Sequence, residues 1–122
     1  MDHPARQYYN PSLTASEERT LLRRNYLLLQ TGQAALGLIG PDMLAIAVEA
    51  QPEAIVLHFA VAAHTTEIDE DINDIAFELD ALLGGGPEQS SGITTQIHLG
   101  QPDNTWPGGA HALLYCAKPA SG

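Results

Sequence analysis

The sequence predicts a single α+β domain in the order α-β-β-α-β-β, with a four-stranded antiparallel sheet and two helices on one face. Apolar residues recur at helical spacing in two segments and at alternate positions in four others. A chain of 122 residues with 44% hydrophobic and 16% charged side chains also has the size and composition of one globular domain. We expect residues 1–12 to form an extended leader, 13–118 the domain and 119–122 a short tail.

The first helix is predicted to begin at a capping box. Thr14 and Glu17 have the spacing at which the threonine hydroxyl accepts from a free backbone N–H while the glutamate reaches back. Apolar residues follow at helical spacing. Gly40 and Pro41 are predicted to end the helix, because proline cannot continue it.

Two strands joined by a short turn are predicted next, at Met43–Ala50 and Ile55–Ala63. Both alternate with a period of two, which is typical of a hairpin with one buried face. The residues expected to face the core are Leu44, Ile46, Val48, Ile55, Leu57, Phe59 and Val61. The opposite face is mostly alanine, and we expect it to be an open surface available for interaction.

The segment Thr66–Leu83 is predicted to be an amphipathic helix, because its apolar residues recur every three or four positions. Seven acidic side chains lie in this segment, and no basic residue is interleaved with them. Gly84–Pro87 is predicted to end the helix.

The last two strands are predicted at Ile93–Leu99 and Ala110–Ala117. The loop between them, Gly100–Gly109, is rich in glycine and proline and holds the only tryptophan, Trp106. Cys116 lies in an apolar strand, so we expect it in the core rather than as a nucleophile.

Charge indicates the kind of partner. The formal net charge is −10, and no lysine or arginine occurs between Arg24 and Lys118. Such a surface repels nucleic acid and anionic membrane and attracts basic proteins. Carboxylates three or four residues apart on a helix repel one another, so we expect a basic partner to relieve that repulsion. The residues predicted to bind this partner are Glu67, Asp69, Glu70, Asp71, Asp74, Glu78 and Trp106, with Tyr8 and Tyr9 as further aromatic anchors.

In its size, acidity and α+β pattern, and in the acidic run Glu67–Asp80, the chain resembles the immunity proteins of bacterial contact-dependent growth inhibition and related polymorphic-toxin systems. The resemblance implies an inhibitor that binds a cognate toxin, often a basic nuclease, and covers its active site. The carboxylates would then take the place of the phosphates of the nuclease substrate.

Two other classes of function stay open. One is a domain that binds a metal or a small molecule on the polar sheet face, where His58, His98 and His111 are expected together with Glu49; three imidazoles and a carboxylate are suitable zinc ligands. The other is a scaffold module whose alanine-rich faces stack, giving a homodimer.

No nucleophile–base pattern or phosphate-binding loop occurs in the sequence, so we expect no enzymatic activity and no cofactor. No apolar run has the length of a signal peptide core or of a membrane span, and the single cysteine fits a reducing compartment. We therefore expect a cytoplasmic protein.

Overall fold

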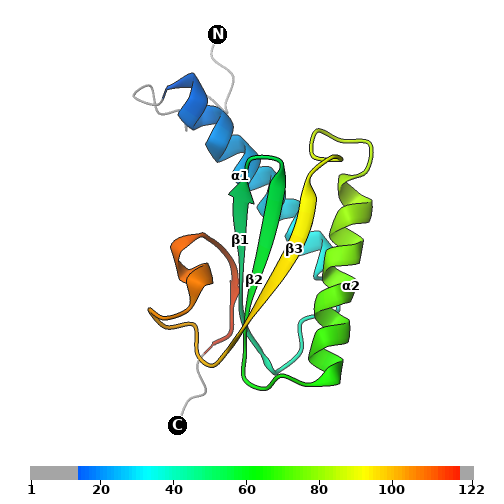
Figure 1. Ribbon diagram of the computed structural model, residues 1–122, viewed down its shortest axis with the longest axis vertical. Coiled ribbons are helices and arrows are strands. Elements are labelled where there is room, and N and C mark those ends of the chain that lie inside the picture. The colour runs from blue at the N-terminus through cyan, green and yellow to red at the C-terminus, as the bar shows by residue number, and fades with distance from the viewer. Residues whose placement is uncertain (1–13, 119–122) are drawn as a thin grey trace.

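The computed structural model describes residues 14–118, which form a four-stranded sheet with two helices on one face (Figure 1). This confirms the predicted α+β class. The predicted leader, with Tyr8 and Tyr9, and the predicted tail lie outside the described residues. The elements in chain order are α1 (Ala15–Ala34), β1 (Met43–Gln51), β2 (Ala54–Val61), α2 (Thr66–Leu83), β3 (Gly92–Leu99), the short 3₁₀ helix η2 (Pro107–Ala110) and β4 (Ala112–Cys116).

The sheet is mixed, so the prediction of a wholly antiparallel sheet is wrong. Its strand order is β3-β2-β1-β4; β1 runs antiparallel to β2 and β4, whereas β2 and β3 are parallel. After β2, helix α2 carries the chain back along the sheet, so β3 starts at the same end as β2 (Figure 1). Parallel neighbours require such a crossover, and alternation of apolar residues does not report strand direction.

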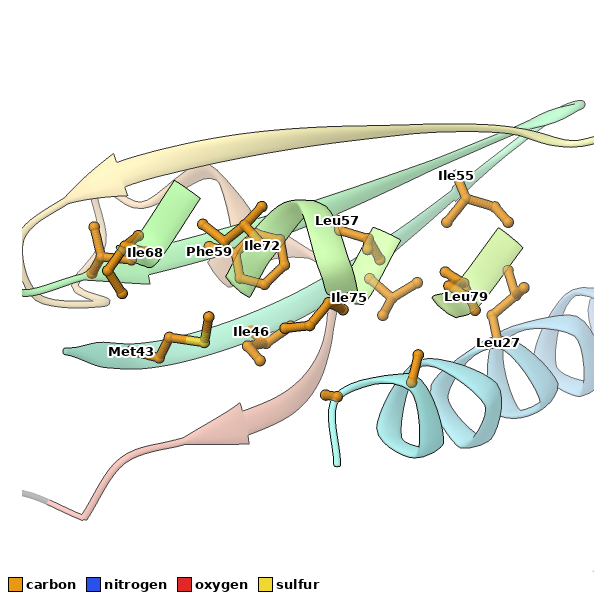
Figure 2. Packing of buried hydrophobic residues seen from close by; sticks show 14 of the residues in the cluster. Leu27, Met43, Ile46, Ile55, Leu57, Phe59, Ile68, Ile72, Ile75 and Leu79 are labelled. Carbon is orange, nitrogen blue, oxygen red and sulfur yellow. The ribbon is translucent and has the colours of Figure 1, made fainter. Parts of the chain in front are cut away.

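The main core lies between the sheet and the two helices (Figure 2). The predicted apolar stripe of α2 is confirmed, because its every third or fourth residue is buried against the sheet. α1 contributes Leu27, Ala34 and Ala35 to the same core. The buried residues of α2 are Ile68, Ile72, Ile75, Leu79 and Leu83.

α1 begins at the predicted capping box. The Thr14 hydroxyl accepts from the Glu17 N–H at 3.1 Å, and the Glu17 carboxylate accepts from the Thr14 N–H at 3.3 Å. The helix ends at Ala34, before the predicted stop at Gly40 and Pro41. Three residues later Gly37 has a φ of 80°, a left-handed conformation that suits glycine, so the chain is already turning before Gly40 and Pro41.

β1 departs from simple alternation at its start. The register between β1 and β2 shifts between Met43 and Ala45, as at a β-bulge. Met43 therefore enters the main core, whereas Leu44, predicted to face it, packs with the alanines on the opposite face.

β4 lies at the edge of the sheet, and its pairing with β1 shifts between Ile46 and Ala47. Leu114 and Tyr115 pack against the main core, but Cys116 is exposed. The expectation that this cysteine is buried is therefore wrong.

Candidate functional sites

The polar side of α2 forms one candidate site, which we call the acidic face. Five of its acids are exposed, Glu67, Glu70, Asp74, Glu78 and Asp80, while Asp69 and Asp71 are partly exposed. Thr65 is the N-cap residue of the helix, and its hydroxyl accepts from the Ile68 N–H at 3.1 Å. Acids in the first turn interact favourably with the positive end of the helix dipole.

Lysine and arginine do not neutralise the acidic face within the described part of the chain. Among residues 14–118, the arginine ion pair joins Arg23 to Glu88 at 2.9 Å, and no lysine or arginine pairs with a carboxylate of α2. His64 contacts Asp69 at 2.6 Å beside the first turn. The rest of the acidic face is left to solvent.

Phe77 lies on the exposed side of α2 with 72% of its surface accessible. Asp74 precedes it by three positions and Asp80 follows it by three, so on a helix the apolar ring lies among carboxylates. Phe77 was not among the residues predicted to bind a partner. The available signal was an aromatic side chain outside the apolar stripe of an otherwise charged helix face.

Trp106 lies on the other side of the sheet and is only 4% exposed. It packs on Ala45, Ala47 and Ala60 and forms a second, smaller core with them. The expectation that this alanine-rich face is open is wrong, because the alanines are small enough to accommodate the indole ring. Trp106 therefore does not share a surface with the acids of α2.

Gly108 allows this loop to lie close to the sheet. A Cβ atom at this position would lie 2.4 Å from the Trp106 ring and 2.8 Å from the Cβ of His58, both inside van der Waals contact. Any larger residue would push η2 away from the sheet.

The second candidate site is a cluster of Glu49, His58 and His111 beside this small core. The Nε2 atoms of both histidines point at the same oxygen, Oε1 of Glu49, at 2.8 Å for His58 and 3.2 Å for His111. The two imidazole rings are stacked, with centroids 5.2 Å apart and an angle of 11° between their planes.

Strand order brings these three side chains together. β1 lies between β2 and β4, and on the face away from the helices Ala47 of β1 is opposite His58. Val48 pairs with Ala112, so His111, one residue before the start of β4, arrives beside Glu49. The face was predicted from alternation, but the meeting of the side chains depends on β4 pairing with β1.

The environment of the cluster favours an ionised carboxylate. The pKa of Glu49 is lowered, first by the hydrogen bond from the Gln51 side-chain amide and then by the hydrogen bond with His58. His58 is 3% exposed and held in place, whereas the side chain of His111 is 32% exposed.

His98, the third histidine predicted for this face, lies outside the cluster. It pairs across the sheet with Ala60 and lines a cavity of about 90 Å³ together with His58 and Trp106. The indole Nε1 of Trp106 is buried and makes no hydrogen bond within the described residues.

No model of a known protein family matches the chain, and no curated protein matches it in sequence. None of the helices in residues 14–118 is long and apolar enough to cross a lipid bilayer.

Proposed function

We propose that this protein is an inhibitor of the immunity type, which binds a basic cognate toxin domain through the acidic face of α2. The observation that carries the proposal is the exposed aromatic ring of Phe77 among carboxylates that no lysine or arginine of residues 14–118 neutralises. Carboxylates on such a face supply attraction, and the ring supplies apolar contact.

When no partner is bound, repulsion between neighbouring carboxylates destabilises α2. Glu70 and Asp74, and likewise Asp74 and Glu78, are four positions apart, where like charges cost about 0.2–0.5 kcal/mol per pair. A basic partner would remove this cost on binding. It would also be drawn to the site, because complementary charge accelerates association.

Electrostatic attraction of the toxin is not sufficient to protect a cell from it. Protection requires a dissociation constant of about nanomolar, which corresponds to a binding free energy of about −12 kcal/mol. Exposed ion pairs contribute only about 0–1 kcal/mol each. The remainder must come from desolvated apolar contact, and aromatic side chains are the common anchors of protein interfaces. Phe77 takes this role in place of Trp106, because the tryptophan is buried on the opposite face of the sheet.

The toxin class follows from the charge. A nuclease binds phosphates through basic residues, and a row of carboxylates presents a similar pattern of negative charge. A neutral or acidic partner would instead add to the repulsion on α2. The proposal therefore requires a toxin domain with a basic active-site surface.

The test first searches the neighbouring reading frames for a toxin-like C-terminal domain with a basic surface, and then measures the binding of that domain to this protein and growth arrest in co-expression. One variant carries Glu70→Gln, Asp74→Asn and Glu78→Gln. The matched control carries Thr20→Lys, Asn25→Lys and Gln33→Lys on exposed positions of α1, so both variants change the net charge by the same amount.

We expect wild type and the α1 control to bind alike and to restore growth. The α2 variant should bind about tenfold more weakly, at roughly half a kcal/mol for each exposed charge pair that is lost. Equal binding by all three proteins would rule out the acidic face as the interface. Absence of binding by wild type would rule out the toxin as the partner.

A further inference from the structure

Glu49, His58 and His111 form a cluster of possible metal ligands that has no part in the proposed binding of a toxin to α2. It lies on the sheet face away from the helices, where Trp106 packs, whereas the acidic face belongs to a helix on the core side. A ligand of the cluster is therefore independent of a partner on α2.

The distances within the cluster are those of ligands that share one ion. Nitrogen and oxygen donors bound at about 2.0–2.2 Å to a tetrahedral zinc ion lie about 3.4 Å from one another. Here the two contacts to Glu49 Oε1 are 2.8 and 3.2 Å, and all three ligand atoms lie within 4.8 Å of one another. A small outward shift of each side chain would make room for an ion.

In the absence of a metal, each Nε2 that contacts the carboxylate must carry a hydrogen, because the carboxylate accepts and does not donate. Two imidazole N–H groups thus share one oxygen. A cation at the centre of the three donors replaces both hydrogens, and in each neutral imidazole the proton is then on Nδ1.

Ring orientation identifies the side chain that must move. A metal ion lies in the plane of each imidazole that binds it, and two nearly parallel, stacked rings do not share such a point. His58 is fixed by burial, with Gly108 and Trp106 against it. His111 is partly exposed and lies between η2 and β4, so it is the ring that turns on binding.

We propose that Glu49, His58 and His111 bind one divalent transition-metal ion, with Zn²⁺ the best match to two imidazoles and one carboxylate. Gln51 acts as a positioning residue, because its amide donates to the other oxygen of Glu49 and orients the carboxylate. A fourth coordination position is left for water or for a group from another molecule.

The experiment measures Zn²⁺ binding by calorimetry, with full-length protein purified without a histidine tag. A background of His3→Ala and His64→Ala leaves only His58, His98 and His111 as histidines. Into this background are placed Glu49→Gln, His111→Ala and, as the matched control, His98→Ala, which removes a histidine from the same sheet face but outside the cluster. Side-chain ¹⁵N NMR of the imidazoles provides a second readout.

We expect one Zn²⁺ per chain in the background protein and in the His98→Ala variant. Loss of even an outer partner of a metal ligand weakens binding by about 10–100-fold, so His111→Ala and Glu49→Gln should each weaken it at least tenfold. The Nε2 resonances of His58 and His111 should shift on addition of Zn²⁺, and the resonance of His98 should not.

Three results would overturn the proposal: no stoichiometric binding, equal loss in the His98→Ala variant, or binding unaffected by the two cluster substitutions. None of these results bears on the toxin-binding test, because both variants there keep the three ligands intact.

Discussion

Gly108 determines how closely the loop that carries Trp106 packs on the sheet. The indole ring of Trp106 and the side chain of His58 both lie against the backbone of η2 at this residue. A Cβ atom added there would be closer to both side chains than van der Waals contact allows. The neighbouring Gly109 is a natural comparison, since a Cβ atom there would have no neighbour nearer than 3.9 Å.

Gly108→Ala should therefore lower the free energy of unfolding by about 1–3 kcal/mol, the usual cost of overpacking. Gly109→Ala should leave it nearly unchanged. Chemical denaturation of the two variants and wild type provides the measurement. If the two substitutions cost the same, the close packing of η2 on Trp106 is not a determinant of stability.

Asp103 is a residue whose ionisation follows directly from a local contact. Its pKa is lowered, chiefly by the hydrogen bond from the Thr105 hydroxyl at 2.6 Å and then by the bond from the Thr105 backbone N–H at 2.9 Å. A carboxyl group with a lowered pKa in the folded state stabilises the fold above its unfolded pKa, and this contribution is lost as the pH falls through the folded value.

Thr105→Val removes the hydroxyl donor and keeps the shape of the side chain. We expect the pKa of Asp103 to rise towards the usual aspartate value of about 3.9, as measured by NMR of its carboxyl carbon during an acid titration. The pKa of Glu49, which is set by different donors, is the internal control. An unchanged titration of Asp103 would exclude the hydroxyl as the principal cause.

At the scale of the element, one side of α2 packs in the core and the other side is exposed to solvent. Leu79 is fully buried against the sheet, whereas Phe77, two residues earlier, is largely exposed. Both are large apolar side chains on the same helix. Comparing them therefore tests whether burial or side-chain type determines how much each contributes to the free energy of unfolding.

Leu79→Ala should lower the free energy of unfolding by about 2–5 kcal/mol, as expected for a large side chain removed from a core. Phe77→Ala should change it by less than about 0.5 kcal/mol, as for an exposed position. Urea denaturation distinguishes the two cases. If Phe77→Ala proved as destabilising as Leu79→Ala, the ring would be part of the fold and not available to a partner.

The sequence predicted elements better than it predicted their arrangement. The capping box at Thr14 and the apolar stripe of α2 follow from local spacing, which the chain alone contains. The parallel pairing of β2 and β3 and the bulge after Met43 depend on contacts between distant segments. The cluster shows the same limit, because alternation placed His58 on the correct face but did not show that Glu49 and His111 would meet it there.

For the whole molecule, the distribution of charge has a kinetic consequence. Replacement of Asp69, Glu70, Asp71 and Asp74 by lysine should leave the fold nearly intact, because these residues are exposed or partly exposed, lie off the buried stripe, and changes at the surface cost under about 0.5 kcal/mol each. Association with a basic partner should slow steeply, since complementary charges act mainly on the association rate.

Stopped-flow measurements at low and high salt would show this effect. For wild type the association rate should fall as salt screens the attraction, and for the reversed variant it should start low and rise or stay flat. Equal association rates for both proteins at low salt would mean that the negative charge of α2 does not accelerate association with the basic partner.

The strand order also dictates the order in which the sheet can be completed during synthesis. β1 and β2 adjoin in sequence and can pair as soon as both have left the ribosome, whereas the other side of β1 stays unpaired until β4, the last strand of the sheet, is made. Until then β1 offers a row of unpaired backbone groups beside uncovered Ala45 and Ala47. The nascent chain is thus most prone to misassociate just before β4 emerges, and slow translation of β4 should increase aggregation.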